Sequence, residues 1–426
     1  MKNHFFGRTL AVLLALLVLG LSLVSCGGAD TTTAASTTAP PETDPPKPVY
    51  DGDFAKPSSS TQAVEDGDYI KVSEVDPAFT SVSGSIVYVN ATAPQISIGG
   101  IEHPTENRGQ YYRLSISDRT KYSDRNSSLA QMTSGVTVRF RTNADYFYLK
   151  TSMRSCTTTY QHFTDRGAFG FDVYTGTGTD RVYCGGAMQM MTNATALNEK
   201  IMLPGGYQEV TVNLPLYGGV NSVQIGLPSN AEICEPTERT YGTVCFYGSS
   251  ITQGGCVSRP GLSYSNIICR MLNADNMNLG FSGSALGEQS IAEYIASRDI
   301  SAFVMDYDYN NTVAGLRSTH YAFYETVRAA HPDIPIVMVT RPIYDAECTS
   351  EQLERQSIVL DSYNRALEAG DTNVYYVCGN DFFMKEMPDL YTVDYTHPND
   401  LGHYNMAKAI FAALKPALEA TYPDAK

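Results

Sequence analysis

The sequence predicts two fold types in one chain. An all-β sandwich, jelly-roll-like, is expected over residues 66–240, and a three-layer α/β/α domain with a parallel sheet over residues 241–426. Short strands of alternating polarity without a convincing helix predict the first part, and strand–helix alternation after Tyr241 predicts the second. Because ligands of parallel sheets bind beyond the carboxyl ends of the strands, we expect the chemistry in residues 241–426.

Length and charge narrow the class of protein. A chain of 426 residues fits two or three domains. Its formal net charge of −15 argues against a broad basic face that would bind nucleic acid or an anionic membrane surface.

The N-terminus has the layout of an export signal. Lys2 and Arg8 precede the apolar run Leu10–Val24, which is short for a membrane span. Residues 23–26 resemble a bacterial lipobox, which implies that residues 1–26 are a lipoprotein signal and that Cys26 carries a lipid anchor on the extracellular face of the membrane. An ordinary cleaved signal with an incidental cysteine is the alternative.

The segment after Cys26 is rich in Thr, Ala and Pro. Residues 27–65 are therefore expected to form a disordered tether, because such a composition buries little apolar area. The eight cysteines beyond Cys26 show no CxxC or metal-ligand spacing, and their disulfide connectivity stays open. Cys245 and Cys269 lie in apolar runs and are expected in the core.

Regular elements can be placed in both parts. In the first part, alternating strands flank turns, with a hairpin expected around residues 175–178; these strands are Val136–Phe140, Tyr146–Leu149, Gly170–Tyr174, Arg181–Tyr183, Glu209–Leu214 and Ser222–Leu227. The second part has candidate strands Thr243–Tyr247, Met277–Leu279, Ala302–Tyr307, Ile334–Thr340 and Asn373–Val377. Its candidate helices are Leu262–Leu272, His320–His331, Ser350–Ala369 and Leu401–Leu418.

A serine stands where the first strand of the second part ends. Val244–Tyr247 is an apolar run, Gly248 follows, and Ser250 lies directly before small and polar residues. A strand, a sharp turn and a serine before a helix expose a nucleophilic hydroxyl above a sheet. Thr252 replaces the second glycine of the strict Gly-x-Ser-x-Gly elbow, and the serine could instead cap the next helix.

A nucleophilic serine needs a base, and His397 is the best placed of the seven histidines. It lies between the last strand and the last helix, three residues after Asp394. On one tight loop, Asp394 can accept from Nδ1–H and leave Nε2 to take the serine proton. His331 is interpreted as a helix C-cap, and His320 as a residue that opens a helix.

Two other strand ends could supply donors to an oxyanion. Asn278–Ser284 is a glycine-rich exit, and residues 302–311 end in two amides, Asn310 and Asn311. Each could also be an ordinary turn or cap.

Taken together, Gly-Ser-Ser-Ile, the glycine loop, the strand-end asparagine and Asp-x-x-His-Pro resemble the SGNH (GDSL-type) hydrolases. The resemblance implies Ser250 as nucleophile, with His397 and Asp394 completing a triad. It also implies Gly283 and Asn310 as oxyanion donors, and no cofactor or metal. The departures are Ser249 in place of the family's Asp and Asp-Tyr-Asn-Asn in place of Gly-x-Asn-Asp.

The resemblance extends to an exported bacterial subgroup with an N-terminal β domain marked by a Gly-x-Asp-Leu-Tyr-like segment. Gly170–Tyr174 and Leu214–Tyr217 match that pattern. Members are mostly carbohydrate esterases, which implies an acetylated polysaccharide as substrate. Arg259 is a candidate substrate contact, or else a salt-bridged surface group.

Rival interpretations stay open. Asp306 and Asp308 resemble the first motif of haloacid-dehalogenase-like phosphatases, although the later blocks of that family are missing; these acids could instead hold the Asn310 loop. A glycan-binding lipoprotein with a degenerate hydrolase domain is the alternative from another class. A lipase or thioesterase is the alternative within the superfamily.

Overall fold

A computed structural model describes residues 65–154, 161–188, 195–344 and 348–425 of the chain. These residues all belong to one compact unit, residues 46–426. The predicted signal peptide, Cys26 and nearly all of the tether lie outside the described residues. Within the described part, no helix has the length and apolar character needed to cross a bilayer.

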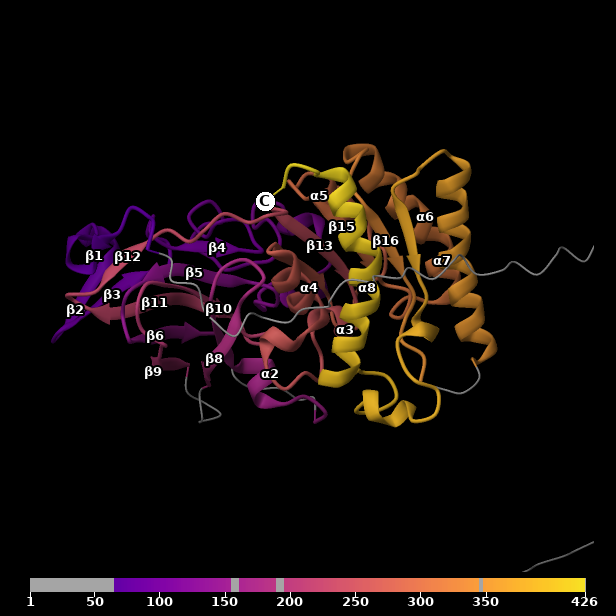
Figure 1. The fold of residues 1–426 in the computed structure, drawn as a ribbon. Coiled ribbons are helices and arrows are strands. Elements are labelled where there is room, and N and C mark those ends of the chain that lie inside the picture. Colours follow the sequence, from indigo (N-terminus) through magenta and orange to yellow (C-terminus); the bar gives the residue numbers. More distant parts are fainter. Residues whose placement is uncertain (1–64, 155–160, 189–194, 345–347, 426) are drawn as a thin grey trace, which may run out of the picture. The chain divides into compact units, whose positions relative to one another are not determined.

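The first half of the structure consists of two antiparallel sheets, here named sheets A and B and together called the sandwich (Figure 1). Sheet A contains β1 (Ile70–Lys71), β12 (Glu232–Cys234), β5 (Thr137–Thr142), β10 (Gln208–Asn213), β7 (Phe171–Thr175) and β8 (Val182–Ala187) in this order, with β4 (Ser97–Gly99) also on β5. Sheet B contains β2 (Thr80–Ser83), β3 (Ile86–Asn90), β11 (Val220–Pro228), β6 (Tyr146–Met153) and β9 (Ala196–Met202).

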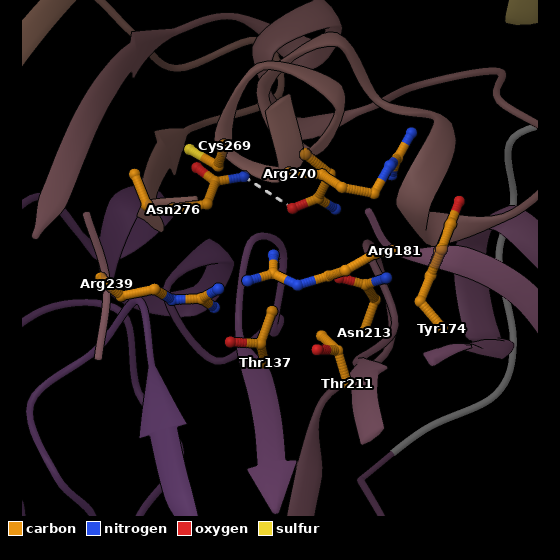
Figure 2. Close-up of a pocket in the computed structure, with 11 residues that line it drawn as sticks. Thr137, Tyr174, Arg181, Thr211, Asn213, Arg239, Cys269, Arg270 and Asn276 are labelled. Carbon is orange, nitrogen blue, oxygen red and sulfur yellow. Dashed lines mark hydrogen bonds between the residues drawn. The ribbon is translucent and has the colours of Figure 1, made fainter. Parts of the chain in front are cut away.

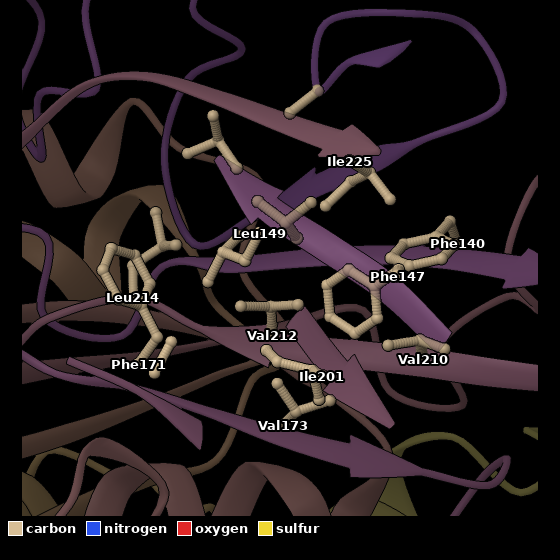
Figure 3. Packing of buried hydrophobic residues seen from close by; sticks show 14 of the residues in the cluster. Phe140, Phe147, Leu149, Phe171, Val173, Ile201, Val210, Val212, Leu214 and Ile225 are labelled. Atoms are coloured by element: carbon tan, nitrogen blue, oxygen red, sulfur yellow. The ribbon is translucent and has the colours of Figure 1, made fainter. Parts of the chain in front are cut away.

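One apolar core lies between sheets A and B. Val210 and Val212 of β10 point into it, as do Phe147 and Leu149 of β6, and all four are fully buried (Figure 3). This arrangement follows from the period-two pattern, since alternate side chains of a strand face opposite sides of a sheet. The antiparallel β region is therefore confirmed, whereas its jelly-roll connectivity stays a prediction.

The predicted hairpin is confirmed, because β7 and β8 pair antiparallel. Two short helices correct the expectation of an all-strand region: α1 (Asp124–Leu129) and α2 (Asp165–Phe169). Ser123 accepts a hydrogen bond from Asn126 N–H, and Thr164 accepts one from Gly167 N–H. These caps satisfy the first turns, so helices too short to show a 3.6-residue period still form.

The second half is a five-stranded sheet, sheet C, and all its strand pairs are parallel. Its order is β14 (Asp275–Gly280), β13 (Thr243–Gly248), β15 (Ala302–Asp306), β16 (Ile336–Val339) and β17 (Val374–Val377). Each predicted strand is present within two residues of its expected bounds. Sheet C and its helices are called the parallel-sheet domain.

Helices cover both faces of sheet C (Figure 1). One apolar cluster holds side chains from α5 (Gln289–Ala296), α6 (Val313–Ala330) and α7 (Ser350–Glu368), and the other holds side chains from α4 (Tyr264–Leu272) and α8 (Asp400–Thr421). The short α3 (Ser250–Gln253) follows β13. The expected core cysteines, Cys245 and Cys269, are buried. Among the described cysteines, none forms a disulfide.

Two helix predictions need correction. Helix α6 begins at Val313, so His320 lies buried in its middle and does not open it. Thr312 caps this helix by accepting from Gly315 N–H at 3.0 Å, which offsets the weak helix propensity of its first turns. Helix α5 was not expected, since it spans only eight residues after a glycine- and serine-rich loop. His331 is the C-cap of α6, as predicted.

Candidate active site

The first strand of sheet C in the sequence, β13, lies at a topological switch point. β13 pairs with β14 on one side and with β15 on the other. The chain first adds β14 to one edge of β13 and then crosses over to add β15, β16 and β17 on the opposite side, so the strand order reverses at β13. Ligands of open parallel sheets bind where this reversal opens a crevice at the carboxyl ends of the strands. Ser250 lies there, two residues after β13 ends at Gly248.

The structure brings Ser250, His397 and Asp394 into one hydrogen-bonded chain. Ser250 Oγ lies 2.9 Å from His397 Nε2, and His397 Nδ1 lies 2.9 Å from Asp394 Oδ2. The backbone N–H groups of Thr396 and His397 donate to the other carboxylate oxygen of Asp394, at 3.0 and 2.7 Å. Both oxygens of Asp394 are thus occupied, and the carboxylate holds the imidazole in one orientation.

The environment sets the charges of the acid and the imidazole. Burial raises the pKa of Asp394, but hydrogen bonds from the backbone and ring of His397 outweigh it and hold that pKa below its usual value. Burial lowers the pKa of His397, although Asp394 acts in the opposite direction. At neutral pH the pair is therefore carboxylate and neutral imidazole, with Nε2 able to accept a proton.

Thr252 explains why the strict serine elbow is not needed here. Its hydroxyl lies 2.9 Å from Asp306 Oδ2, at the end of the neighbouring strand β15. The hydroxyl of Tyr264 donates to the same oxygen at 2.8 Å. A Cβ on Gly248 would lie 2.1 Å from Thr252 Oγ1, so only glycine fits beneath this turn. The serine turn is thus fixed to sheet C by a buried hydroxyl–carboxyl network.

The same contacts assign Asp306 and Asp308. Burial raises the pKa of Asp306 to about 8 and that of Asp308 to about 6. Asp308 accepts from Arg341 N–H at 3.1 Å. Asp306 therefore holds the Ser250 turn rather than the Asn310 loop, and a fully buried neutral carboxyl is a poor match to the ionised nucleophile of a phosphatase.

The predicted oxyanion donors lie on one side of the serine turn. Phe281 N–H donates to Gly248 O at 2.8 Å, which holds the loop of Gly283 against the end of β13. Gly283 has φ +67°, and a Cβ there would meet nothing within 4 Å. Neither Ser250 N–H nor Gly283 N–H donates to another group of the described chain. Two unsatisfied N–H groups therefore remain at this edge of the sheet.

Of the two strand-end amides, Asn310 lies beside the predicted oxyanion donor Gly283, and Asn311 bonds elsewhere. Asn310 Nδ2 lies 3.2 Å from Phe281 O, next to the Gly283 turn, whereas Asn311 Nδ2 donates to Leu286 O. Asn278 has a supporting position beneath the loop. It is fully buried, donates to Thr252 O at 2.6 Å and accepts from Gly280 N–H at 2.9 Å.

Sequence reasoning missed the side chains that the chain before residue 241 contributes. Tyr217 donates its hydroxyl to Ser250 O at 3.0 Å. Arg113, only 1% exposed, donates to Asn278 O and Gly280 O, both at 2.8 Å, and lies over the ring of Phe281. Arg113 and Tyr217 therefore fix the oxyanion loop and the serine turn from outside the parallel-sheet domain.

His162 is a further neighbour that sequence reasoning left unassigned. Its ring stacks on that of His397 with centroids 4.9 Å apart. His162, Cys256 and His397 offer ligand atoms within 4.8 Å of one another, the one such group found among the described residues. The two ring nitrogens of His397 already bond to Ser250 and Asp394, so a metal bound to His397 would break one of these two contacts.

Arg259, the candidate substrate contact, lies in a different environment. Its guanidinium is 2.7 Å from Asp172 Oδ2 and 2.6 Å from the hydroxyl of Tyr174, and it lies over the ring of Tyr183. Asp172 and Tyr174 belong to the Gly-x-Asp-Leu-Tyr-like segment. Arg259 thus joins the sandwich to the parallel-sheet domain.

The fold and the serine–histidine–carboxylate chain resemble those of hydrolases that hold a serine at the switch point of a parallel sheet with helices on both faces. Residues 242–415 match the GDSL-like lipase/acylhydrolase family, and residues 86–233 match the N-terminal GxDLY region of SGNH-hydrolase-type esterases. Both halves of the chain are thus similar to SGNH (GDSL-type) hydrolases that carry this N-terminal region. No curated protein sequence matches the chain.

Solved structures share the fold across both halves. A protein from Bacteroides ovatus ATCC 8483 named as a GDSL-like lipase is 24% identical, with a TM-score of 0.68 over 79% of this chain and 98% of its own. The salicylyl-acyltransferase SsfX3 of a tetracycline biosynthetic pathway is 19% identical, with a TM-score of 0.65 over 77% and 96%. A family two carbohydrate esterase from Clostridium thermocellum is 17% identical, with a TM-score of 0.51 over 66% and 92%.

Proposed function

We propose that this protein is a serine esterase that removes short acyl groups, chiefly acetyl, from polysaccharides. The observation that carries the proposal is the unbroken chain from Ser250 through His397 to Asp394, with 2.9 Å at each step between side chains. A serine so connected loses its proton to the imidazole as it attacks a carbonyl carbon. The similarity in fold to a carbohydrate esterase supports a sugar ester as substrate.

The reaction proceeds in two half-reactions. Ser250 Oγ bonds to the ester carbonyl carbon while His397 Nε2 takes the hydroxyl proton. The tetrahedral intermediate collapses, His397 returns that proton to the departing sugar hydroxyl, and the acyl group stays on Ser250. Water then attacks the acyl-enzyme by the same proton transfers, releasing the carboxylic acid and restoring Ser250.

Three donors stabilise the oxyanion in both half-reactions. They are the N–H groups of Ser250 and Gly283 and the side-chain amide of Asn310. One Asn310 amide hydrogen goes to Phe281 O, which orients the group and leaves the second hydrogen for the oxyanion. Such preorganised donors supply about 2.7–4 kcal/mol each to the transition state.

The lipid anchor remains part of the proposal. A lipidated Cys26 and the Thr/Ala/Pro-rich tether would hold the esterase at the outer face of a membrane, within reach of extracellular glycans. Labelling cells with an alkyne-tagged fatty acid tests the anchor, and Cys26→Ala is expected to lose the label.

The test of the serine mechanism compares wild type with Ser250→Ala. Wild type is expected to release acetate from 4-nitrophenyl acetate and from at least one acetylated xylan, mannan, pectin or peptidoglycan. Ser250→Ala is expected to lose about 10⁴-fold or more in kcat with an unchanged circular dichroism spectrum. Retained turnover in Ser250→Ala would reject Ser250 as the nucleophile. No adduct of wild type with a fluorophosphonate would favour a glycan-binding protein instead. A preference for octanoyl over acetyl esters would point to a lipase.

A further inference from the structure

A small, partly enclosed cavity, lined by none of Ser250, His397 and Asp394, lies between sheet A and the parallel-sheet domain (Figure 2). Thr137 and Thr211 of the sandwich line one side of it, and Asn276 and Arg270 line the other. Figure 2 shows the guanidinium group of Arg181 between these two sides, with that of Arg239 close to it. The cavity volume is about 20 Å³, which exceeds the roughly 10–15 Å³ that one water-sized occupant needs.

The charges around this cavity do not balance. Arg139, Arg181 and Arg239 lie in one electrostatic cluster with two carboxylates, Glu209 and Asp275. Arg239 Nε is 2.6 Å from Asp275 Oδ1, and Arg139 Nε is 3.4 Å from Glu209 Oε1. These pairs use both carboxylates, so the cluster keeps one positive charge.

Arg181 carries that surplus charge. Its side chain bonds to the neutral amide oxygen of Asn273, and within the described chain no carboxylate oxygen lies within 4.0 Å of its guanidinium. Arg181 is 4% exposed, and its Nε has no hydrogen-bond partner among the described residues. Burial lowers the pKa of Arg181, and Arg239 adds to this effect. A guanidinium rarely gives up its proton, so a buried guanidinium without a carboxylate partner is stabilised by binding an anion.

The cavity also offers neutral donors. The hydroxyl groups of Thr137 and Thr211 are buried without a hydrogen-bond partner in the described chain. Arg270 brings a further positive charge to the rim, where it lies over the ring of Tyr174. A site of this size accepts one spherical ion but not a multi-atom oxyanion such as sulfate or acetate.

We propose that this cavity binds one halide ion, chloride in a cell, which neutralises Arg181 between the sandwich and the parallel-sheet domain. The contacts divide between the two halves of the chain, since Arg181, Thr137 and Thr211 come from sheet A or its loops. Arg270 comes from α4 of the parallel-sheet domain. The ion therefore stabilises the junction of the two halves rather than either half alone.

The first test measures the thermal unfolding of the full chain at constant ionic strength, with sodium chloride exchanged for sodium gluconate. Chloride is expected to raise the Tm along a saturable curve, because an anion that binds only the folded state stabilises it by mass action. Crystals grown in bromide are expected to show one anomalous peak beside Arg181. Equal Tm values in both salts, or no bromide peak, would mean that the cavity holds only water and would overturn the proposal.

The second test uses matched variants. Arg181→Gln removes the surplus charge and is expected to weaken chloride stabilisation at least tenfold in midpoint concentration. Arg317→Gln removes an exposed arginine paired with Glu354 and should respond like wild type. If Arg181→Gln does not fold, Thr211→Val replaces one hydroxyl donor and should raise the chloride midpoint several-fold. An unchanged midpoint in both cavity variants would contradict the assignment.

Discussion

The turn that carries Ser250 and the loop that carries Asp394 and His397, here called the serine turn and the histidine loop, hold the two ends of one hydrogen bond. They differ in burial and in the origin of the contacts that hold them. Ser250 is 7% exposed, and its turn is held by Thr252, Asp306 and Tyr217, which come from several elements. The side chain of Asp394 is 34% exposed, and its bonds to His397 and Thr396 lie within one short loop.

This difference separates two tasks. In the proposed mechanism, Ser250 must keep a fixed distance from the oxyanion donors, and it lies in a buried network that spans both halves of the molecule. In the same mechanism, His397 must pass a proton from the serine to the leaving group and from water, and a carboxylate on its own loop suffices to orient its ring. Damage to the loop should therefore affect chemistry alone, whereas damage to the network should affect chemistry and stability together.

The largest effect in this comparison is expected from the histidine loop. Asp394→Asn keeps the shape of the side chain but favours the wrong tautomer of His397, so kcat should fall by about 10⁴-fold. The midpoint of urea unfolding should stay near that of wild type, because the loop is exposed. A Tm loss as large as that of a core variant would show that the loop is not a local unit.

A smaller loss of activity, now with a loss of stability, is expected from the serine turn. Asp306→Ala leaves the buried hydroxyls of Thr252 and Tyr264 without their acceptor, at about 1–3 kcal/mol each. The displaced serine should lower kcat by about 10²-fold. Both losses are measurable by urea unfolding and by hydrolysis of 4-nitrophenyl acetate.

Asp306→Asn is the matched control for that variant. The raised pKa of Asp306, about 8, means that the native carboxyl is protonated at pH 7, and an amide has the same shape. Its folded pKa lies above its unfolded value, about 3.9, so its stabilising contribution is complete below that value and is lost as pH rises through about 8. The stability of Asp306→Asn relative to wild type should therefore increase from pH 6 to pH 9. Equal loss in both variants would reject this role.

The smallest effect is expected from His162, which touches the base without joining the hydrogen-bonded chain. Burial and, to a lesser degree, the charge of His162 lower the pKa of His397. Wild-type kcat/KM should therefore be flat near pH 7 and fall only below about 6.5, the ordinary histidine value. His162→Ala should reduce activity a few-fold and move this acid limb to higher pH. His103→Ala, which alters a histidine bonded to Thr105, should leave the profile unchanged.

Sequence patterns predicted the fold because each pattern is local. Alternation in Glu209–Leu214 and the apolar run before Gly248 depend on neighbouring residues, and the structure has strands at both places. The proximity of Ser250, His397 and Asp394 was predictable for a related reason. Carboxyl ends of parallel strands meet at one edge, so loops far apart in sequence become neighbours.

Contacts between the halves were not predictable in this way. Arg113 and Asn278 are 165 positions apart, and no periodicity links them. The polar side of sheet A had the pattern of a solvent-facing surface, yet Thr137, Arg139 and Thr211 are buried. Alternation reveals which face of a sheet is apolar, but it does not reveal what covers the other face.

Arg113 has a consequence for how this chain can change over evolutionary time. Its two hydrogen bonds to β14 reach carbonyls at the base of the oxyanion loop, and they come from a residue more than one hundred positions before Gly248. A gene fragment that begins at residue 241 would encode Ser250, Asp394 and His397 but would lose the two hydrogen bonds from Arg113. The boundary near residue 240 thus separates an antiparallel from a parallel region, but the two regions are not interchangeable domains. Recombination at that point would separate Ser250 from residues that hold its surroundings in place.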